Sequence, residues 1–177
     1  TLTFDIFLHL STLLAVFYFF WPKIQKLSKH DLLMVGVGTI PAVIFGGFFK
    51  KNVEVLFHSA QIVGITLLIT SCVNFLLAWM LKRNPDEKSR KIKLIDALII
   101  GLFQAFAIIP GISRSGSTLF GGIFRKKTRE TAFNFAFFLS IPAILGATML
   151  QAIEIWQVGL PQINLTSYLI GGGAALT

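Results

Sequence analysis

Nine consecutive residues combine hydroxyl groups, glycines and one arginine inside an otherwise apolar chain; they read Pro-Gly-Ile-Ser-Arg-Ser-Gly-Ser-Thr and occupy positions 110–118. Gly111 and Gly116 permit backbone conformations with positive φ, in which successive N–H groups can form a nest for an anion. Arg114 offers a planar fork that matches phosphate oxygens. Further donors are the hydroxyls of Ser113, Ser115, Ser117 and Thr118. The segment therefore predicts a site for a phosphate or a diphosphate, with Gln104 placed to brace the loop from the preceding helix.

The composition shows what surrounds this segment. Of 177 residues, 54% are hydrophobic and only 14% are charged, whereas soluble domains carry about 25% charged residues. This balance predicts an integral membrane protein. The net charge of +8 lies in short loops between apolar segments, so it is better explained by orientation in a bilayer than by nucleic-acid binding. Cys72 is the only cysteine, which excludes a disulfide or a cysteine-rich metal site within the chain.

Apolar segments predict the membrane spans of a single transmembrane domain. The predicted spans cover about 4–21, 32–49, 55–81, 131–153 and 167–177, the last of them cut short. The segment 94–124 differs, because its apolar part before Pro110 has only about two-thirds of the ~20 residues that a spanning helix needs. Irregular backbone at membrane depth is tolerated only inside protein or beside a wet cavity. An arginine at that depth is costly, by roughly 2.5–3.5 kcal/mol, and marks a functional site.

The charges of the loops test whether this segment crosses. A full crossing would put the basic residues of 82–93 and those of 125–130 on opposite faces of the membrane, against the positive-inside rule. If the segment dips in and returns, loops 22–31, 82–93 and 125–130 are all cytoplasmic, with thirteen basic residues inside against two, Lys50 and Lys51, outside. We therefore predict a re-entrant helix-loop-helix over about 94–124, with Arg114 at its tip.

The predicted fold class is an all-α, polytopic helical bundle that contains this re-entrant hairpin. A short internal sequence similarity relates Thr39–Ile44 to Ser140–Leu145. It suggests one inverted repeat and part of a second, an arrangement common in membrane proteins that handle polar substrates. Chance similarity in so apolar a chain is the alternative.

Simpler explanations of the polar segment stay open. Its serines and glycines could serve only a tight contact between helices, with Arg114 paired to Asp96 or to a carbonyl group. A purely structural membrane subunit is a second alternative, and a transporter or flippase that binds a phosphate-bearing lipid without cleaving it is a third. The density of hydrogen-bond donors around an arginine favours the anion site over tight packing alone.

Residues 101–118, Gly-Leu-Phe-Gln-Ala-Phe-Ala-Ile-Ile-Pro-Gly-Ile-Ser-Arg-Ser-Gly-Ser-Thr, resemble the second signature of the undecaprenyl-diphosphate phosphatases, the bacitracin-resistance protein family. Residues 4–16 and 138–147 also resemble segments of that family. The resemblance covers essentially the whole chain. It implies a membrane hydrolase that removes the terminal phosphate of undecaprenyl diphosphate and so recycles the lipid carrier for cell-wall synthesis. It also implies that Arg114 clamps the diphosphate, that Ser113 and Thr118 hydrogen-bond it, and that Ser115 lies close by.

The family's first signature, which carries glutamates, a serine and a histidine, is expected upstream of Thr1, and the chain's C-terminal end is also read as a truncation. The loop around Arg114 offers no carboxylate or histidine. A divalent cation, Mg or Ca, and the general base are therefore assigned to the missing segment, and this piece alone is expected to be inactive. The other large class of lipid phosphatases is excluded, because no Pro-Ser-Gly-His motif occurs and no histidine follows His58. Lipid chain length and homo-oligomerisation stay open.

Overall fold

The computed structural model describes residues 2–57, 59–83 and 91–158. This part of the chain is built from helices, with no strand among the described residues. The helices are α1 (Leu2–Ile24), α2 (Lys29–Phe57), α3 (Ala60–Arg83), α4 (Leu94–Phe106), α5 (Arg114–Phe124) and α6 (Arg129–Val158). The predicted all-α class is therefore confirmed.

Among the described residues, three segments are long and apolar enough to cross a membrane. They are Lys29–Phe49 in α2, Ala60–Lys82 in α3 and Arg129–Leu150 in α6. Large apolar side chains on these helices are exposed, among them Phe48 at 82% and Phe75 at 77%. Soluble monomers rarely expose apolar surface of this extent, so the chain is an integral membrane protein. The last predicted span, 167–177, lies outside the described residues.

One helix boundary differs from the prediction. The sequence predicts a break at Lys50 and Lys51 and a new span from residue 55, but the backbone stays helical to Phe57 and α3 begins at Ala60. Residues 55–57 thus belong to α2. Lysine and glutamate are good helix formers, so a charge that ends an apolar run need not end the helix.

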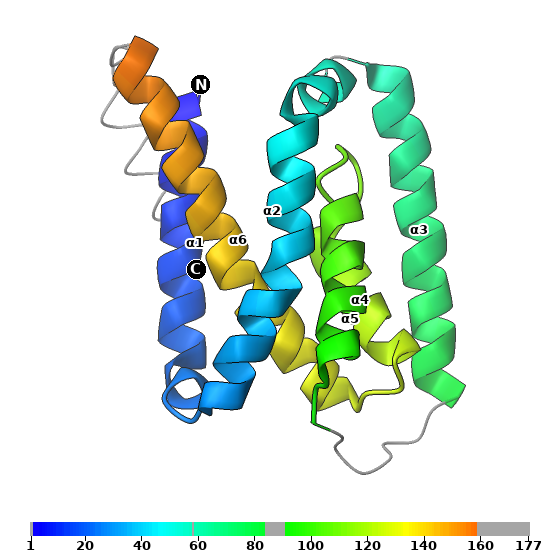
Figure 1. Ribbon diagram of the computed structural model, residues 1–177. Coiled ribbons are helices and arrows are strands. Elements are labelled where there is room, and N and C mark those ends of the chain that lie inside the picture. Colours follow the sequence, from blue (N-terminus) through cyan, green and yellow to red (C-terminus); the bar gives the residue numbers. More distant parts are fainter. Residues whose placement is uncertain (1, 58, 84–90, 159–177) are drawn as a thin grey trace. The chain divides into compact units, whose positions relative to one another are not determined.

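The chain divides into two compact units. One comprises Thr1–Ser28 with Ile141–Thr177, and the other comprises Lys29–Ser140. The second unit holds the candidate site. Within it α4 packs against α2 and α5, and α5 packs against α3, so the short helices α4 and α5 lie between two long ones (Figure 1). This unit has two clusters of buried hydrophobic residues, and the first part of α6 contributes to each. One cluster contains Met34, Ile92, Ala97, Ile100, Phe135 and Leu139, and the other contains Leu77, Ile123 and Ala132.

Two glycines set the close crossing of α2 and α4. A Cβ atom on Gly101 would overlap the carbonyl group of Gly38, and one on Gly38 would lie 3.1 Å from the carbonyl oxygen of Ala97. Helices in membranes use such small residues because close backbone approach supplies van der Waals contact that lipid does not. This contact fixes α4, and with it the hairpin, on α2.

Candidate anion-binding site

A helical hairpin carries the candidate site. Helix α4 has 13 residues and α5 has 11, which corresponds to roughly 20 Å and 16 Å of length. Neither helix can cross a hydrocarbon core of about 30 Å by itself. They pack side by side and are joined by the turn 107–113 (Figure 1). The helix-loop-helix predicted from the sequence is therefore present, and its return to the starting face of a membrane stays a prediction.

Helix α3 holds the tip of the hairpin through two threonines. The Oγ1 atom of Thr66 lies 2.5 Å from the carbonyl oxygen of Pro110. The Thr70 hydroxyl donates to the carbonyl oxygen of Gly111 at 2.8 Å and accepts from the Ser113 N–H at 3.1 Å. Gly111 has a φ of +89°, a conformation that costs glycine little, and a Cβ atom there would overlap the Thr66 hydroxyl. The turn is thus tied to α3 by its backbone.

The first turn of α5 presents free N–H groups. Ser113 is the N-cap, and its Oγ accepts from the Gly116 N–H at 3.2 Å. Its carbonyl oxygen accepts from the Ser117 N–H at 2.9 Å. The N–H groups of Arg114 and Ser115 have no acceptor in the described part of the chain. A helix N-terminus with unpaired N–H groups favours an anion through both hydrogen bonding and the helix dipole.

Arg114 is the first residue of α5 and is half-buried. Within residues 2–57, 59–83 and 91–158 its guanidinium has no ion pair or hydrogen bond. The alternative in which Arg114 pairs with Asp96 is wrong, because both Asp96 oxygens are held by other cations. An arginine removed from water without a counterion lacks the compensation that buried charges normally have. Its most direct partner is an anionic ligand.

The other hydroxyls predicted for the site differ in their availability. Ser115 is exposed, with its Oγ 3.5 Å from that of Ser113. Ser117 and Thr118 are buried. The Thr118 hydroxyl lies 2.9 Å from the carbonyl oxygen of Arg114 and 3.2 Å from that of Ser115, so it is engaged by its own helix. Ser113 and Ser115 are therefore the two hydroxyl residues that lie at the N-terminus of α5 and are not buried.

Gln104 of α4 does not brace the loop as predicted. It is 2% exposed, and neither its Oε1 nor its Nε2 has a hydrogen-bond partner among the described residues. Unpaired buried amides are rare and costly. Ile100 contacts Gly121 across the hairpin, so one turn closer to the tip Gln104 lies at the level of Ser117. Gln104 is therefore a buried amide inside the hairpin without a described partner, and its contact with a ligand stays a prediction.

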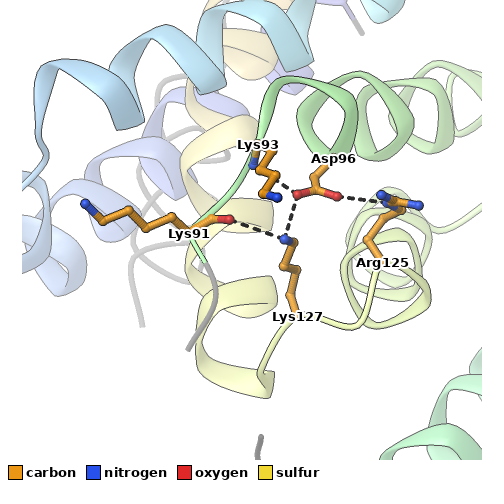
Figure 2. Close-up of polar contacts among 5 residues, drawn as sticks. All are labelled: Lys91, Lys93, Asp96, Arg125 and Lys127. Carbon is orange, nitrogen blue, oxygen red and sulfur yellow. Dashed lines mark hydrogen bonds and ion pairs between the residues drawn. The ribbon is translucent and has the colours of Figure 1, made fainter. Parts of the chain in front are cut away.

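A buried ion cluster closes the base of the hairpin (Figure 2). Asp96, in the first turn of α4, accepts from Arg125 Nε at 2.8 Å and pairs with Lys127 Nζ at 2.6 Å. It also accepts from the Lys93 N–H at 3.0 Å, and Lys127 Nζ donates to the carbonyl oxygen of Lys91 at 3.3 Å. Asp96 is 1% exposed and Lys127 8%. The residues before α4 and after α5 are thus joined at one end of the hairpin.

The environment of Asp96 shifts its titration. Burial raises the pKa of its carboxyl group, but this is outweighed by hydrogen bonds from Lys127, the Lys93 N–H and Arg125 and by the charge of Lys127, so the pKa lies below its ordinary value. Asp96 lies outside the three candidate spans. It is therefore ionised at neutral pH.

The sequence analysis did not predict that α3 contributes residues to the candidate site. Thr66, Thr70 and Asn74 are spaced by four residues, which places them on one face of a helix. That face meets the hairpin tip, because Thr66 and Thr70 bond its backbone and Asn74 approaches Gly116. Polar residues at this spacing in an apolar span are the signal that could have revealed it.

Comparison with known proteins places the chain in a family. The family described as "Bacitracin resistance protein BacA" matches residues 1–177. The chain belongs to the bacitracin resistance protein BacA family. It is 41% identical over 171 residues to undecaprenyl-diphosphatase 4 of Bacillus cereus (strain ZK / E33L), covering 94% of this chain and 65% of that protein. It is also 37% identical over 190 residues to the undecaprenyl-diphosphatase of Alkaliphilus metalliredigens, covering 94% of this chain and 68% of that protein.

A third relative, the undecaprenyl-diphosphatase of Thermosipho africanus, is 39% identical over 177 residues, with 94% of this chain and 67% of that protein covered. The chain thus spans about two thirds of the length of the curated relatives that it matches. The family resemblance predicted from residues 101–118 is confirmed. The match covers the helices around the hairpin as well as the hairpin and Arg114.

Proposed function

We propose that this chain is part of an enzyme that hydrolyses the terminal phosphate of undecaprenyl diphosphate, giving undecaprenyl phosphate and inorganic phosphate. The observation that carries the proposal is Arg114 at the start of α5, which has no partner among the described residues and lies beside free N–H groups of the same helix turn and two serine hydroxyls. The name undecaprenyl-diphosphatase, borne by relatives at 37–41% identity, supplies the substrate class. In a bacterium the product would serve again as lipid carrier for cell-wall synthesis.

The residues of the site would act by binding and by charge stabilisation. Attack of water on the terminal phosphorus breaks its bond to the bridging oxygen, and negative charge collects on the equatorial and leaving oxygens. Arg114 would place two N–H groups on these oxygens, while the Arg114 and Ser115 backbone N–H groups donate from the helix terminus. The Ser113 and Ser115 hydroxyls would orient the phosphate. No described residue at the tip is a carboxylate or histidine able to take the proton from water.

A divalent cation, Mg or Ca, belongs to the proposal as a helper that neutralises phosphate charge. The described residues do not fit it, since they contain no group of three or more histidine, cysteine, aspartate or glutamate side chains that could hold a metal ion. Arg114, a cation itself, is also unsuited to ligation. Any metal ligands would therefore have to come from outside the described residues.

We also propose that the hairpin enters the bilayer from the cytoplasmic face. The support is the ion cluster of Asp96, Arg125 and Lys127, which joins the residues flanking the hairpin. With loops 22–31, 82–93 and 125–130 on the same side, the basic residues of the chain obey the positive-inside rule. The lipid diphosphate would then meet Arg114 with its chain in the bilayer and its phosphates at the hairpin tip.

The test uses the intact protein, purified in detergent, with release of inorganic phosphate from a polyprenyl diphosphate as the readout. Arg114→Ala is expected to lower kcat/KM by at least about 10³-fold, the size of effect seen when an arginine is removed from a phosphoryl-transfer site. Arg114→Lys keeps the charge but loses the fork, and should recover only part of the rate. Lys126→Ala, an exposed cation in the loop after α5, is the control and should match wild type. Tight binding of the lipid without phosphate release by wild type would contradict the proposal and indicate a carrier.

A further inference from the structure

We propose that Asn74 of α3 is a substrate-binding residue of the same site, donating a carboxamide N–H to the phosphate held at the start of α5. This inference rests on the proposed function, because it names a further ligand of that diphosphate. It is carried by three observations: the position of Asn74 against the first turn of α5, its lack of a partner among the described residues, and its place on a face of α3 that otherwise contacts the hairpin tip.

The position follows from the space around Gly116. A Cβ atom built on Gly116 would lie 2.6 Å from Asn74 Oδ1 and 3.1 Å from Ser113 Oγ. The carboxamide and the N-capping hydroxyl therefore border the same point beside the first turn of α5. Glycine at 116 leaves the room that lets the carboxamide approach. The two atoms of an amide head are distinguished only by their hydrogen bonds, so a half-turn of the head would present Nδ2 to a ligand.

The carboxamide has no partner in the described part of the chain, although Asn74 is exposed on a candidate spanning helix. Hydroxyls on the same helix bond to their own backbone, as Ser71 does to the Leu67 carbonyl oxygen at 3.0 Å. A polar group that is removed from water without a hydrogen bond is destabilising. An apolar residue at position 74 would avoid this cost. A ligand that accepts a hydrogen bond from the amide would explain why a polar residue occupies this position.

The face of α3 on which Asn74 lies supports the same inference. Thr66 and Thr70, eight and four residues before Asn74, both bond the backbone of the turn 107–113. Thr70 also accepts from the N–H of Ser113, which caps α5. Asn74 continues this row by one turn, alongside α5. Of the three side chains, it is the one left free to contact a ligand, because the two threonine hydroxyls are engaged by the hairpin.

A neutral amide at this place suits a phosphate better than a second charge would. Arg114 already supplies the cation, and an amide N–H adds a directional hydrogen bond without further charge in a partly dry site. Hydrogen bonds to charged groups contribute about 1.5–3 kcal/mol, which corresponds to about 10- to 100-fold in kcat/KM.

Three variants of the intact protein test the inference, with phosphate release from a polyprenyl diphosphate as the assay. Asn74→Ala should lower kcat/KM by about 10- to 100-fold. Asn74→Asp has the same shape but places a negative charge beside the phosphate, so it should lose more activity than Asn74→Ala at pH 8. The control is Ser71→Ala, a change on the same helix at an exposed hydroxyl that bonds only its own backbone; it should match wild type.

Folding is separated from binding by measuring the thermal unfolding midpoint of each variant without lipid. Because Asn74 has no described partner, Asn74→Asp should unfold within about 2 °C of wild type while its kcat/KM falls. Activity of Asn74→Asp equal to that of wild type would overturn the role of Asn74 and leave the diphosphatase proposal standing. Absence of phosphate release by wild type itself would instead remove the proposed function. An activity loss that tracks a fall in unfolding temperature would assign Asn74 a structural role and also overturn the inference.

Discussion

Asparagine in place of Asp96 is expected to destabilise the folded protein by about 3 kcal/mol. Asp96 pairs with Lys127 at 2.6 Å, and the two side chains are 2% and 5% exposed. Removing one partner of a buried pair costs about 3–5 kcal/mol, because the other charge is left without compensation. The asparagine side chain keeps one oxygen that can accept a hydrogen bond, so we expect a cost at the lower end of this range. Arg125 adds little to this figure, since its side chain is 34% exposed and can turn toward water.

The assay is thermal unfolding of the intact protein in detergent, followed by loss of helical circular dichroism. For a chain of this size 1 kcal/mol shifts Tm by about 2–4 °C, so about 6–12 °C is expected. Glu130→Gln, the same chemical change at an exposed carboxylate, is the control and should shift Tm little. A double variant, Asp96→Leu with Lys127→Leu, removes both charges and should regain most of the loss. A Tm for Asp96→Asn within 2 °C of Glu130→Gln would refute the buried pair as a stabilising contact.

Three more predictions concern the hairpin. Gly101→Ala should destabilise by about 1–3 kcal/mol, because a Cβ atom there overlaps Gly38, whereas Gly64→Ala, which meets open space, should be neutral or better in the same unfolding assay. Thr70→Val removes two hydrogen bonds to the hairpin tip and should raise the hydrogen-exchange rate of the turn amides by about 10- to 30-fold, read by mass spectrometry. The folded state lowers the pKa of Asp96, so the ionised carboxylate stabilises the fold fully above the pKa of the unfolded chain, about 4, and this stabilisation is lost as pH falls through the folded pKa. The difference in Tm between wild type and Asp96→Asn should therefore be constant from pH 5 to 8 and shrink below pH 4.

The sequence predicts the two short helices of the hairpin from one pattern and their return to the starting face of a membrane from another; the structure confirms the short helices, and the return stays a prediction. The apolar run before Pro110 is too short to cross, and the basic loops at 82–93 and 125–130 fit one face of a membrane. In the structure, α4 and α5 are two short packed helices, and Arg114 starts the second. The first pattern depends on residues close in sequence, and the second depends only on the charge of each loop. Features that depend on such patterns within short segments are the ones that can best be predicted from a single sequence.

The partners of Asp96 and the contribution of α3 could not be read in the same way. Arg125 and Lys127 reach Asp96 from 29 and 31 positions along the chain, and nothing local distinguishes them from Arg114 as partners. Thr66 and Thr70 bond residues more than 40 positions away. Such contacts depend on how helices pack, and an apolar helix with weak amphipathicity gives little indication of which face meets its neighbour.

Two features of the hairpin leave Arg114 available for a ligand. Asp96, the carboxylate within residues 94–124, lies at the base of the hairpin, about a helix length from Arg114 at the tip, and its two oxygens bind Arg125 and Lys127. At the tip, Thr70 fixes the turn so that the N-terminus of α5 and Arg114 present donors together without an acceptor from the described residues. A site with its positive charge held in place before the ligand arrives needs little reorganisation when charge develops on a phosphate. The hairpin thus holds its carboxylate in a structural ion pair at one end and presents Arg114, without a described partner, at the other.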